Sequence, residues 1–142
     1  MGDVILRAAT VAELPAVLAF WRSAAENESR PVDTGAAVEA LFRRDPEALI
    51  LAVDGAEIVG TVIAGWDGWR CHLYRLAVAP HRRREGLGGR LVTAAEERFT
   101  SFGGTRTDAM VLDGNIVAHG IWAAHGYRRQ DDWSRWVKPL GQ

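Results

Sequence analysis

A glycine-rich loop between a strand-like segment and a helix-like segment constrains the fold of this chain more than any other feature. Residues 69–78 alternate along their length and stop before Pro80, as expected for a strand that ends there. The loop follows at 83–90, and the next apolar residues recur at helical spacing, at Leu87, Leu91, Ala94 or Ala95, and Phe99. We therefore predict a strand, a loop and a helix in series. Unbroken alternation would place Arg70, His72, Tyr74, Leu76 and Val78 on one face of the strand and Cys71, Leu73, Arg75 and Ala77 on the other.

The loop has the chemistry of an anion-binding site. Its glycines let backbone N–H groups approach an anion closely, and the helix start adds roughly half a positive charge from its dipole. Three arginines, at 82, 83 and 84, precede the glycines and could bond to phosphate. The alternative is an ordinary glycine-rich turn beside a solvated basic run. The spacing does not match the G-x-G-x-x-G pattern of dinucleotide-binding folds.

The remaining segments predict a mixed α/β sheet. Further strands are expected at 4–8, 49–53, 58–64 and 105–112, and a closing strand or hairpin is expected at 127–137. A capping box formed by Thr10 and Glu13 opens a first helix that fades near Asn27, Thr34 caps a second helix, and a last helix covers 116–125. Asp54 and Gly55 suit a tight hairpin turn.

Composition and charge exclude several functional classes. The 142 residues suit one domain, 1–142, and a formal net charge of -1 provides no general attraction to nucleic acid or an anionic membrane. We find no export signal, lipidation signal or apolar run long enough to span a membrane. Cys71 is the only cysteine, so no internal disulfide and no zinc-ligand spacing exist, and a reducing cytoplasmic setting is expected.

Two motifs in order resemble those of a known family. The first runs Leu76-Ala77-Val78-Ala79-Pro80, then Arg83-x-x-Gly86-x-Gly88; the second runs Asn115-x-x-Ala118-x-x-Ile121-Trp122-x-x-x-Gly126-Tyr127. Together they resemble the GNAT (GCN5-related) N-acetyltransferases, particularly small bacterial single-domain members. The likeness covers nearly the whole chain. It implies the GNAT acyl-CoA N-acyltransferase fold, with mostly antiparallel N-terminal strands and a central CoA-binding strand and helix.

The resemblance also implies acetyl-CoA as cosubstrate and no metal. Loop amides would hold the pyrophosphate, and the backbone of the preceding strand would pair with the pantetheine arm. The residues implied in cofactor binding are Leu76, Ala77, Val78, Arg83, Arg84, Gly86, Leu87, Gly88, Gly89, Asn115 and Trp122. For Asn115, a role as an ordinary helix N-cap is an equal alternative.

Two histidines are the candidate catalytic residues. His72 lies where histone-modifying members of the family carry their glutamate base, although it could equally be a polar residue near a strand edge. Trp122 replaces the tyrosine that usually protonates the coenzyme thiolate, and an indole N–H is not a usable acid. His119 shares a helical face with Asn115 and Trp122 and is a substitute acid, or else a packing or capping residue.

The expected function is N-acetylation of a primary amine by direct attack within a ternary complex. The acceptor, a small molecule or a protein, is not specified by the sequence. Transfer of a longer acyl group and a non-catalytic CoA-binding sensor stay open as alternatives. The oligomeric state is also open, with a homodimer as one option.

Overall fold

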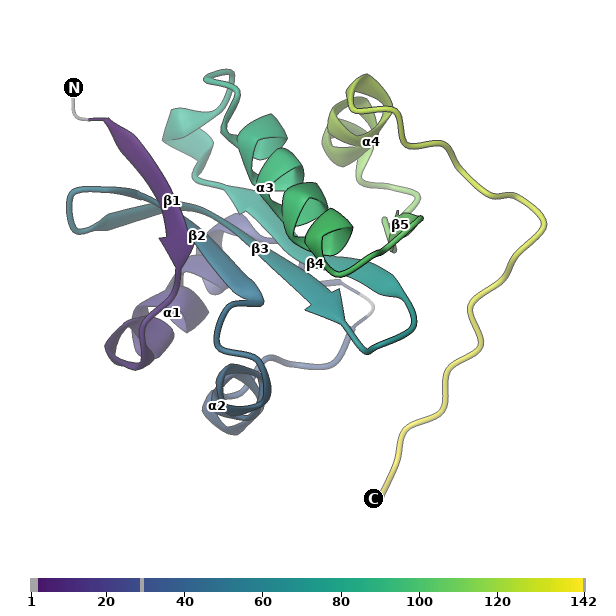
Figure 1. Ribbon diagram of the computed structural model, residues 1–142, viewed down its shortest axis with the longest axis horizontal. Coiled ribbons are helices and arrows are strands. Elements are labelled where there is room, and N and C mark those ends of the chain that lie inside the picture. Colours follow the sequence, from purple (N-terminus) through teal and green to yellow (C-terminus); the bar gives the residue numbers. More distant parts are fainter. Residues whose placement is uncertain (1–2, 29, 142) are drawn as a thin grey trace.

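The computed structural model describes residues 3–28 and 30–141, which form one mixed sheet with helices on both faces (Figure 1). The strands follow the chain in the order β1-β2-β3-β4-β5. Their bounds are β1 Val4–Ala8, β2 Leu49–Asp54, β3 Glu57–Trp66, β4 Cys71–Val78 and β5 Thr107–Ala109. The helices are α1 Leu14–Ala24, α2 Gly35–Arg44, α3 Leu87–Ser101 and α4 Ile116–Ala124, with short 3-10 turns at Val11–Glu13 and Pro80–Arg82.

The sheet is antiparallel up to β4, and β5 then pairs with β4 in parallel. This arrangement confirms the predicted mixed sheet with antiparallel N-terminal strands. The parallel step requires a crossover, which α3 provides by packing across β2, β3 and β4. Among the described residues, no helix has the length and apolar character needed to cross a membrane.

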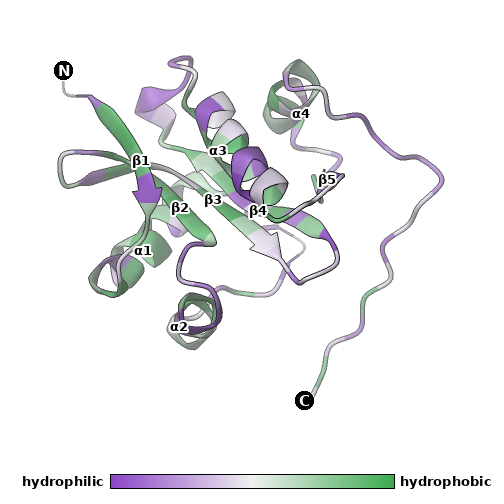
Figure 2. Cartoon of the chain, viewed as in Figure 1, coloured by the Kyte–Doolittle hydropathy of each residue, from purple (hydrophilic) through white to green (hydrophobic). Residues whose placement is uncertain are grey.

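Two apolar clusters cover the two faces of the sheet. Helices α1 and α2 bury Leu14, Val17, Trp21 and Val38 against β2, while α3 buries Leu87, Leu91, Val92, Ala95 and Phe99 against the opposite face. Residues 49–53 of β2 are therefore buried on both faces, which explains the continuous apolar run there. Figure 2 shows the same pattern, with apolar colour along the central strands and polar colour on the outer side of α3.

The predicted alternation along β4 is wrong beyond Tyr74. Arg75 has a φ of 52°, and the pairing with β3 shifts at this point, so β4 contains a bulge. An extra residue in one strand reverses the faces of the residues that follow. Consequently Cys71, Leu73, Leu76 and Val78 all pack in the apolar cluster between α3 and the sheet. Unbroken alternation predicts Leu76 and Val78 on the opposite face of the strand.

The two C-terminal strands also differ from the prediction. The strand expected at 105–112 is confirmed only at Thr107–Ala109, because the bulge bends β4 away after the pair Leu73 and Ala109. The closing strand or hairpin expected at 127–137 is wrong: residues 128–141 form neither helix nor strand and run apart from the sheet (Figure 1). Their large apolar side chains do not alternate and are exposed, to 92% at Trp136, so pairing would bury no continuous face.

The capping box at the start of the first helical segment is confirmed. Glu13 accepts a bond from the backbone N–H of Thr10 at 2.9 Å and forms a two-point ion pair with Arg7. The bond from Arg7 is the largest cause that lowers the pKa of Glu13 from 4.5 to about 2. The ionised carboxylate therefore stabilises the folded state, fully so above the unfolded pKa of 4.5.

Replacing Glu13 by glutamine should reduce the free energy of unfolding at pH 7 by about 1 kcal/mol. The difference from the natural chain should shrink as the pH falls from 4.5 towards 2, because Glu13 itself then becomes protonated. Urea unfolding at a series of pH values measures this difference. A difference that stays constant down to pH 2 would contradict the role of the charge.

Candidate functional site

The backbone of β4 is open along half of its length. Strand β5 pairs only with Cys71, His72 and Leu73, although β4 continues to Val78. In the described part of the chain, no strand pairs with β4 between Tyr74 and Val78 on that side. An extended ligand can therefore hydrogen-bond to this edge as an added strand.

The glycine loop at the end of this edge has two residues in left-handed backbone conformation. Gly86 has a φ of 79° and precedes the first residue of α3, while Arg84 has a φ of 68°. The first intrahelical bond of α3 runs from the N–H of Arg90 to the carbonyl of Gly86. The N–H groups of the first turn therefore have no partner within the helix. This geometry suits an anion at the start of α3.

The three loop arginines differ in their contacts. Arg82 is bound to Asp54 at 2.9 Å and to Glu85 at 3.0 Å, so it braces the loop. Arg83 and Arg84 are exposed and have no ion pair with any residue the structure describes. Of the three arginines, Arg83 and Arg84 are therefore the two whose side chains are available to bind an anion.

Helix α4 closes the other side of the loop. A Cβ atom at Gly88 would lie 3.6 Å from Ile121 of α4 and 3.9 Å from Val78 of β4, so three elements meet at this glycine. A Cβ atom at Gly89 would clash with the imidazole ring of His125. His125 donates from Nδ1 to the carbonyl of Ile121 at 2.9 Å, which keeps its ring against the start of α3.

The α4 residues predicted from the sequence have structural contacts. Asn115 caps α4 by accepting a bond from the N–H of Ala118 at 3.3 Å. Trp122 is buried and stacks edge-on against Tyr127, with ring centres 4.9 Å apart. His119 donates from Nε2 to the carbonyl of Leu112 at 3.2 Å. These are capping and packing contacts, and no contact joins His119 to His72 among the described residues.

Tyr127 is bound to Glu96 at 2.7 Å and is unsuited to supply a proton. Burial, followed by this hydrogen bond, raises the pKa of Tyr127 above its ordinary value of 10.0.

His72 lies between two carboxylates beside the open edge. Its Nδ1 is 2.8 Å from Oδ1 of Asp108 on β5, and its Nε2 is 3.7 Å from Oδ2 of Asp67. Because an ionised carboxylate only accepts, Nδ1 carries a proton and Nε2 of the neutral ring can accept one. Backbone N–H groups of Arg70 and Trp69 lower the pKa of Asp67, which therefore stays ionised.

Tyr74 borders the same place, with its ring 6.2 Å from that of His72. Burial and then the Asp108 carboxylate raise the pKa of Tyr74, so its hydroxyl stays protonated at neutral pH. The histidine, its two carboxylates and this phenol form a polar cluster that can take up a proton and stabilise the cation formed.

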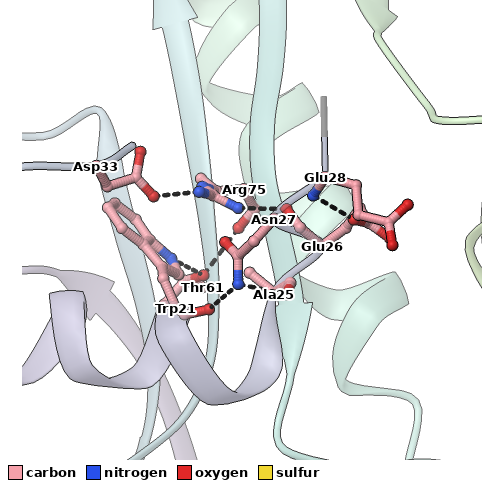
Figure 3. A network of polar contacts seen from close by, with 8 residues as sticks. All are labelled: Trp21, Ala25, Glu26, Asn27, Glu28, Asp33, Thr61 and Arg75. Atoms are coloured by element: carbon pink, nitrogen blue, oxygen red, sulfur yellow. Dashed lines mark hydrogen bonds and ion pairs between the residues drawn. The ribbon is translucent and has the colours of Figure 1, made fainter. Parts of the chain in front are cut away.

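A second polar network lies at the bulge, on the α1 side of the sheet (Figure 3). It joins Trp21 of α1, Thr61 of β3 and Arg75 of β4 to Glu26 and Asp33 of the connection between α1 and α2. Sequence reasoning missed this role of Arg75, and also Asp108 as the partner of His72. A positively charged residue in the middle of an apolar strand was the available signal for Arg75. Nothing local marks Asp108, which is 36 residues from His72 in the chain.

Comparisons with known proteins agree with this geometry. Residues 15–127 match the model of the acetyltransferase (GNAT) family. An acetyltransferase of Yersinia pestis strain Pestoides F is 31% identical over 94 residues, which are 66% of this chain and 67% of that protein. An acetyltransferase of Sodalis glossinidius is 28% identical over 94 residues, 66% of each chain. The chain therefore belongs to the GNAT family of acetyltransferases.

Solved structures share the fold. Ard1 from Thermoplasma volcanium superimposes with a TM-score of 0.75 at 18% identity, over 87% of this chain and 81% of that chain. The diaminobutyrate acetyltransferase EctA from Paenibacillus lautus, solved with L-2,4-diaminobutyric acid and coenzyme A, gives a TM-score of 0.73 at 16% identity, over 88% and 75% of the two chains. At such identities the likeness concerns the fold alone.

Proposed function

We propose that the protein transfers an acetyl group from acetyl-CoA to a primary amine of a small molecule or protein, by direct attack in a ternary complex. The observation that carries this proposal is the open edge of β4, from Tyr74 to Val78, which leads directly into the glycine loop at the start of α3. An extended pantetheine arm fits such an edge, and a diphosphate fits the first turn of α3. In a GNAT acetyltransferase, these two features beside each other favour an acyl-CoA.

The chain's own residues then have defined roles. The backbone of Leu76, Ala77 and Val78 would bind the pantetheine, and the N–H of Val78 would stabilise the oxyanion. The amides of Arg84, Gly86, Leu87, Gly88 and Gly89, with the Arg83 charge, would hold the pyrophosphate. Asn115 would act through its cap on α4, and Trp122 would support α4 from the core.

His72 is the proposed base. Its Nε2 would take the amine proton as nitrogen attacks the thioester carbon, and Asp108 on Nδ1 would hold the ring in that tautomer. The carbon–sulfur bond then breaks and coenzyme A leaves as a thiolate. A thiol with a pKa of roughly 8.5 is a tolerable leaving group, so His119 is a proton donor of secondary importance.

The proposal is tested by calorimetric titration with acetyl-CoA, followed by thiol release with spermidine, kanamycin, a lysine-containing peptide and a peptide with a free N-terminus. Binding together with thiol release above background for one of these amines supports the transferase. Binding with only background hydrolysis across the panel would favour a non-catalytic CoA-binding sensor. This alternative arises because Trp122 stands where the family usually has a tyrosine. Absence of binding would overturn the cofactor assignment.

Replacing His72 by glutamine should lower kcat for the accepted amine at least about tenfold, while the Kd for acetyl-CoA stays unchanged. The His72→Gln variant should also lose the pH dependence of kcat/KM that a catalytic base confers. The exposed His81, whose one ion-pair partner among the residues described by the structure is Glu57 at 3.2 Å, provides a matched control. An unchanged pH profile in the His72→Gln variant would remove His72 as the base.

A further inference from the structure

We infer that Arg75 is a positioning residue that attaches the connection between α1 and α2 to the strand on which acetyl-CoA is proposed to lie. This connection comprises residues 25–28 and 30–34. The inference deepens the proposed function and rests on it, because it assigns the connection to the acceptor side of the same site. The role concerns geometry, since Arg75 is not proposed to touch the reacting atoms.

The main chain of Arg75 belongs to the open strand. Arg75 stands between His72, the proposed base, and residues 76–78, the proposed pantetheine edge. Its carbonyl accepts a hydrogen bond from the hydroxyl of Thr61 at 2.8 Å, and that hydroxyl accepts one from the Trp21 indole at 2.9 Å. Thr61 and Trp21 are both buried, so α1 and β3 together hold the bulge carbonyl in place.

Whereas the carbonyl of Arg75 is bound to Thr61, its side chain points towards the connection (Figure 3). The guanidinium donates to the carbonyl of Glu26 at 2.6 Å and to the carboxylate of Asp33, and it lies 5.5 Å from the centre of the Trp21 ring. One planar group thus reaches both ends of the connection and the face of the helix before it. Arginine provides this fixed fork of donors, whereas lysine would provide a single point charge.

The guanidinium of Arg75 is buried where it contacts the connection. Only 5% of its side chain is exposed, against 33% for that of Asp33. A buried guanidinium needs its partners, because an unpaired charge in that position is strongly unfavourable. The buried guanidinium of Arg75 therefore keeps its partners in the connection, Glu26 and Asp33, next to the bulge in β4.

The consequence is a physical link between two parts of the proposed site. The connection is held at the bulge, next to the stretch between His72 and Val78 where the amine would attack. In the proposed site, a small displacement of the connection would change the orientation of an acceptor without disturbing the pyrophosphate cradle at Gly86. Losing the guanidinium should therefore impair use of the amine and leave the binding of acetyl-CoA nearly intact.

The test uses the full chain and three variants, Arg75→Gly, Arg75→Met and Asp33→Asn. Glycine accepts the φ of 52° without strain, so Arg75→Gly keeps the bulge and removes only the contacts of the side chain with Glu26, Asp33 and Trp21. Arg43→Met removes an exposed arginine of α2 and is the matched control. Calorimetry with acetyl-CoA, hydrogen exchange of the connection, and kinetics with the best amine of the panel are measured for each variant.

We expect amides of the connection to exchange at least about tenfold faster in both Arg75 variants, and less so in Asp33→Asn. The kcat/KM for the amine should fall about tenfold or more, with the Kd for acetyl-CoA within about threefold of that of the natural chain. Arg43→Met should match the natural chain throughout. A conserved Kd also shows that the variants are folded.

Unchanged exchange in the connection would overturn the inference, and so would an unchanged kcat/KM for the amine. Loss of acetyl-CoA binding in Arg75→Gly would overturn it as well, because Arg75 would then serve the coenzyme strand itself. If no amine of the panel is acetylated by the natural chain, the proposed function fails separately, and the exchange measurement still decides whether Arg75 holds the connection.

Discussion

The Gly86→Glu variant is expected to lose calorimetrically detectable binding of acetyl-CoA, a weakening of at least about a hundredfold. Gly86 immediately precedes α3 in a left-handed conformation, with a φ of 79°. A glutamate there would place a carboxylate beside the free N–H groups of the first turn, where the diphosphate is proposed to bind. The side chain would therefore compete for the same donors and repel the ligand.

A matched control separates this effect from backbone strain. Gly103 lies just beyond the opposite end of α3, has a φ of 87°, and has open space where a Cβ would be, as Gly86 has. Glutamate costs roughly 1–2 kcal/mol in this conformation at either glycine. The Gly103→Glu variant should lose similar stability and still bind acetyl-CoA. Equal loss of binding in both variants would mean that the effect is one of folding, and full binding by Gly86→Glu would remove the proposed cradle.

The Leu91→Ala variant is expected to lose about 3–4 kcal/mol of unfolding free energy. Leu91 is completely buried in the N-terminal half of α3, where this helix packs on β3. The residue facing it is Gly60, whose added Cβ would lie 2.9 Å from Cδ1 of Leu91. A glycine has no side chain that could move into the space, so the cavity stays open and its cost adds to the lost burial of the leucine side chain.

A double-mutant cycle tests this packing directly. Gly60→Ala alone should be destabilising, because its methyl group meets Leu91 and lies 3.3 Å from the carbonyl of Ala77. In the Leu91→Ala background the same methyl group should fill part of the cavity, with a coupling of about 1 kcal/mol or more in favour of the double variant. Urea unfolding of the four proteins measures the cycle. Strictly additive effects would show that Leu91 and Gly60 do not share this space.

Most of the helical and central strand segments could be predicted from the sequence because their signals are local. The Thr10 and Glu13 capping box, the Thr34 cap and the apolar stripe of α3 depend on contacts within a few residues. The predicted strands at 4–8, 49–53 and 58–64 have the spacing and turn residues that specify such elements by themselves. The prediction failed for β4 beyond Tyr74 and for the segment 127–137, where pairing with other strands decides the outcome.

The candidate site divides in the same way. The glycine loop and His72 could be named in advance because the loop is a short motif and His72 has a fixed spacing from it. The carboxylate of Asp108 and the guanidinium of Arg75 could not, since their partners are 36 and 42 residues away in the chain. For Asn115, His119 and Trp122, the residue type suggested a role, but the cap, the carbonyl contact and the burial were visible only in the fold.

The sequence by itself determined the order of helices and strands as far as α4, the position of the glycine loop and, through two motifs, membership in the GNAT family. Only the tertiary structure decided where β4 bulges, which part of its edge is open, and which charged groups surround His72 and Arg75. The physical reason is the range of the interactions. Helix caps, turns and apolar periodicity act over a few residues, whereas strand register and buried ion pairs join residues that only the folded chain brings together.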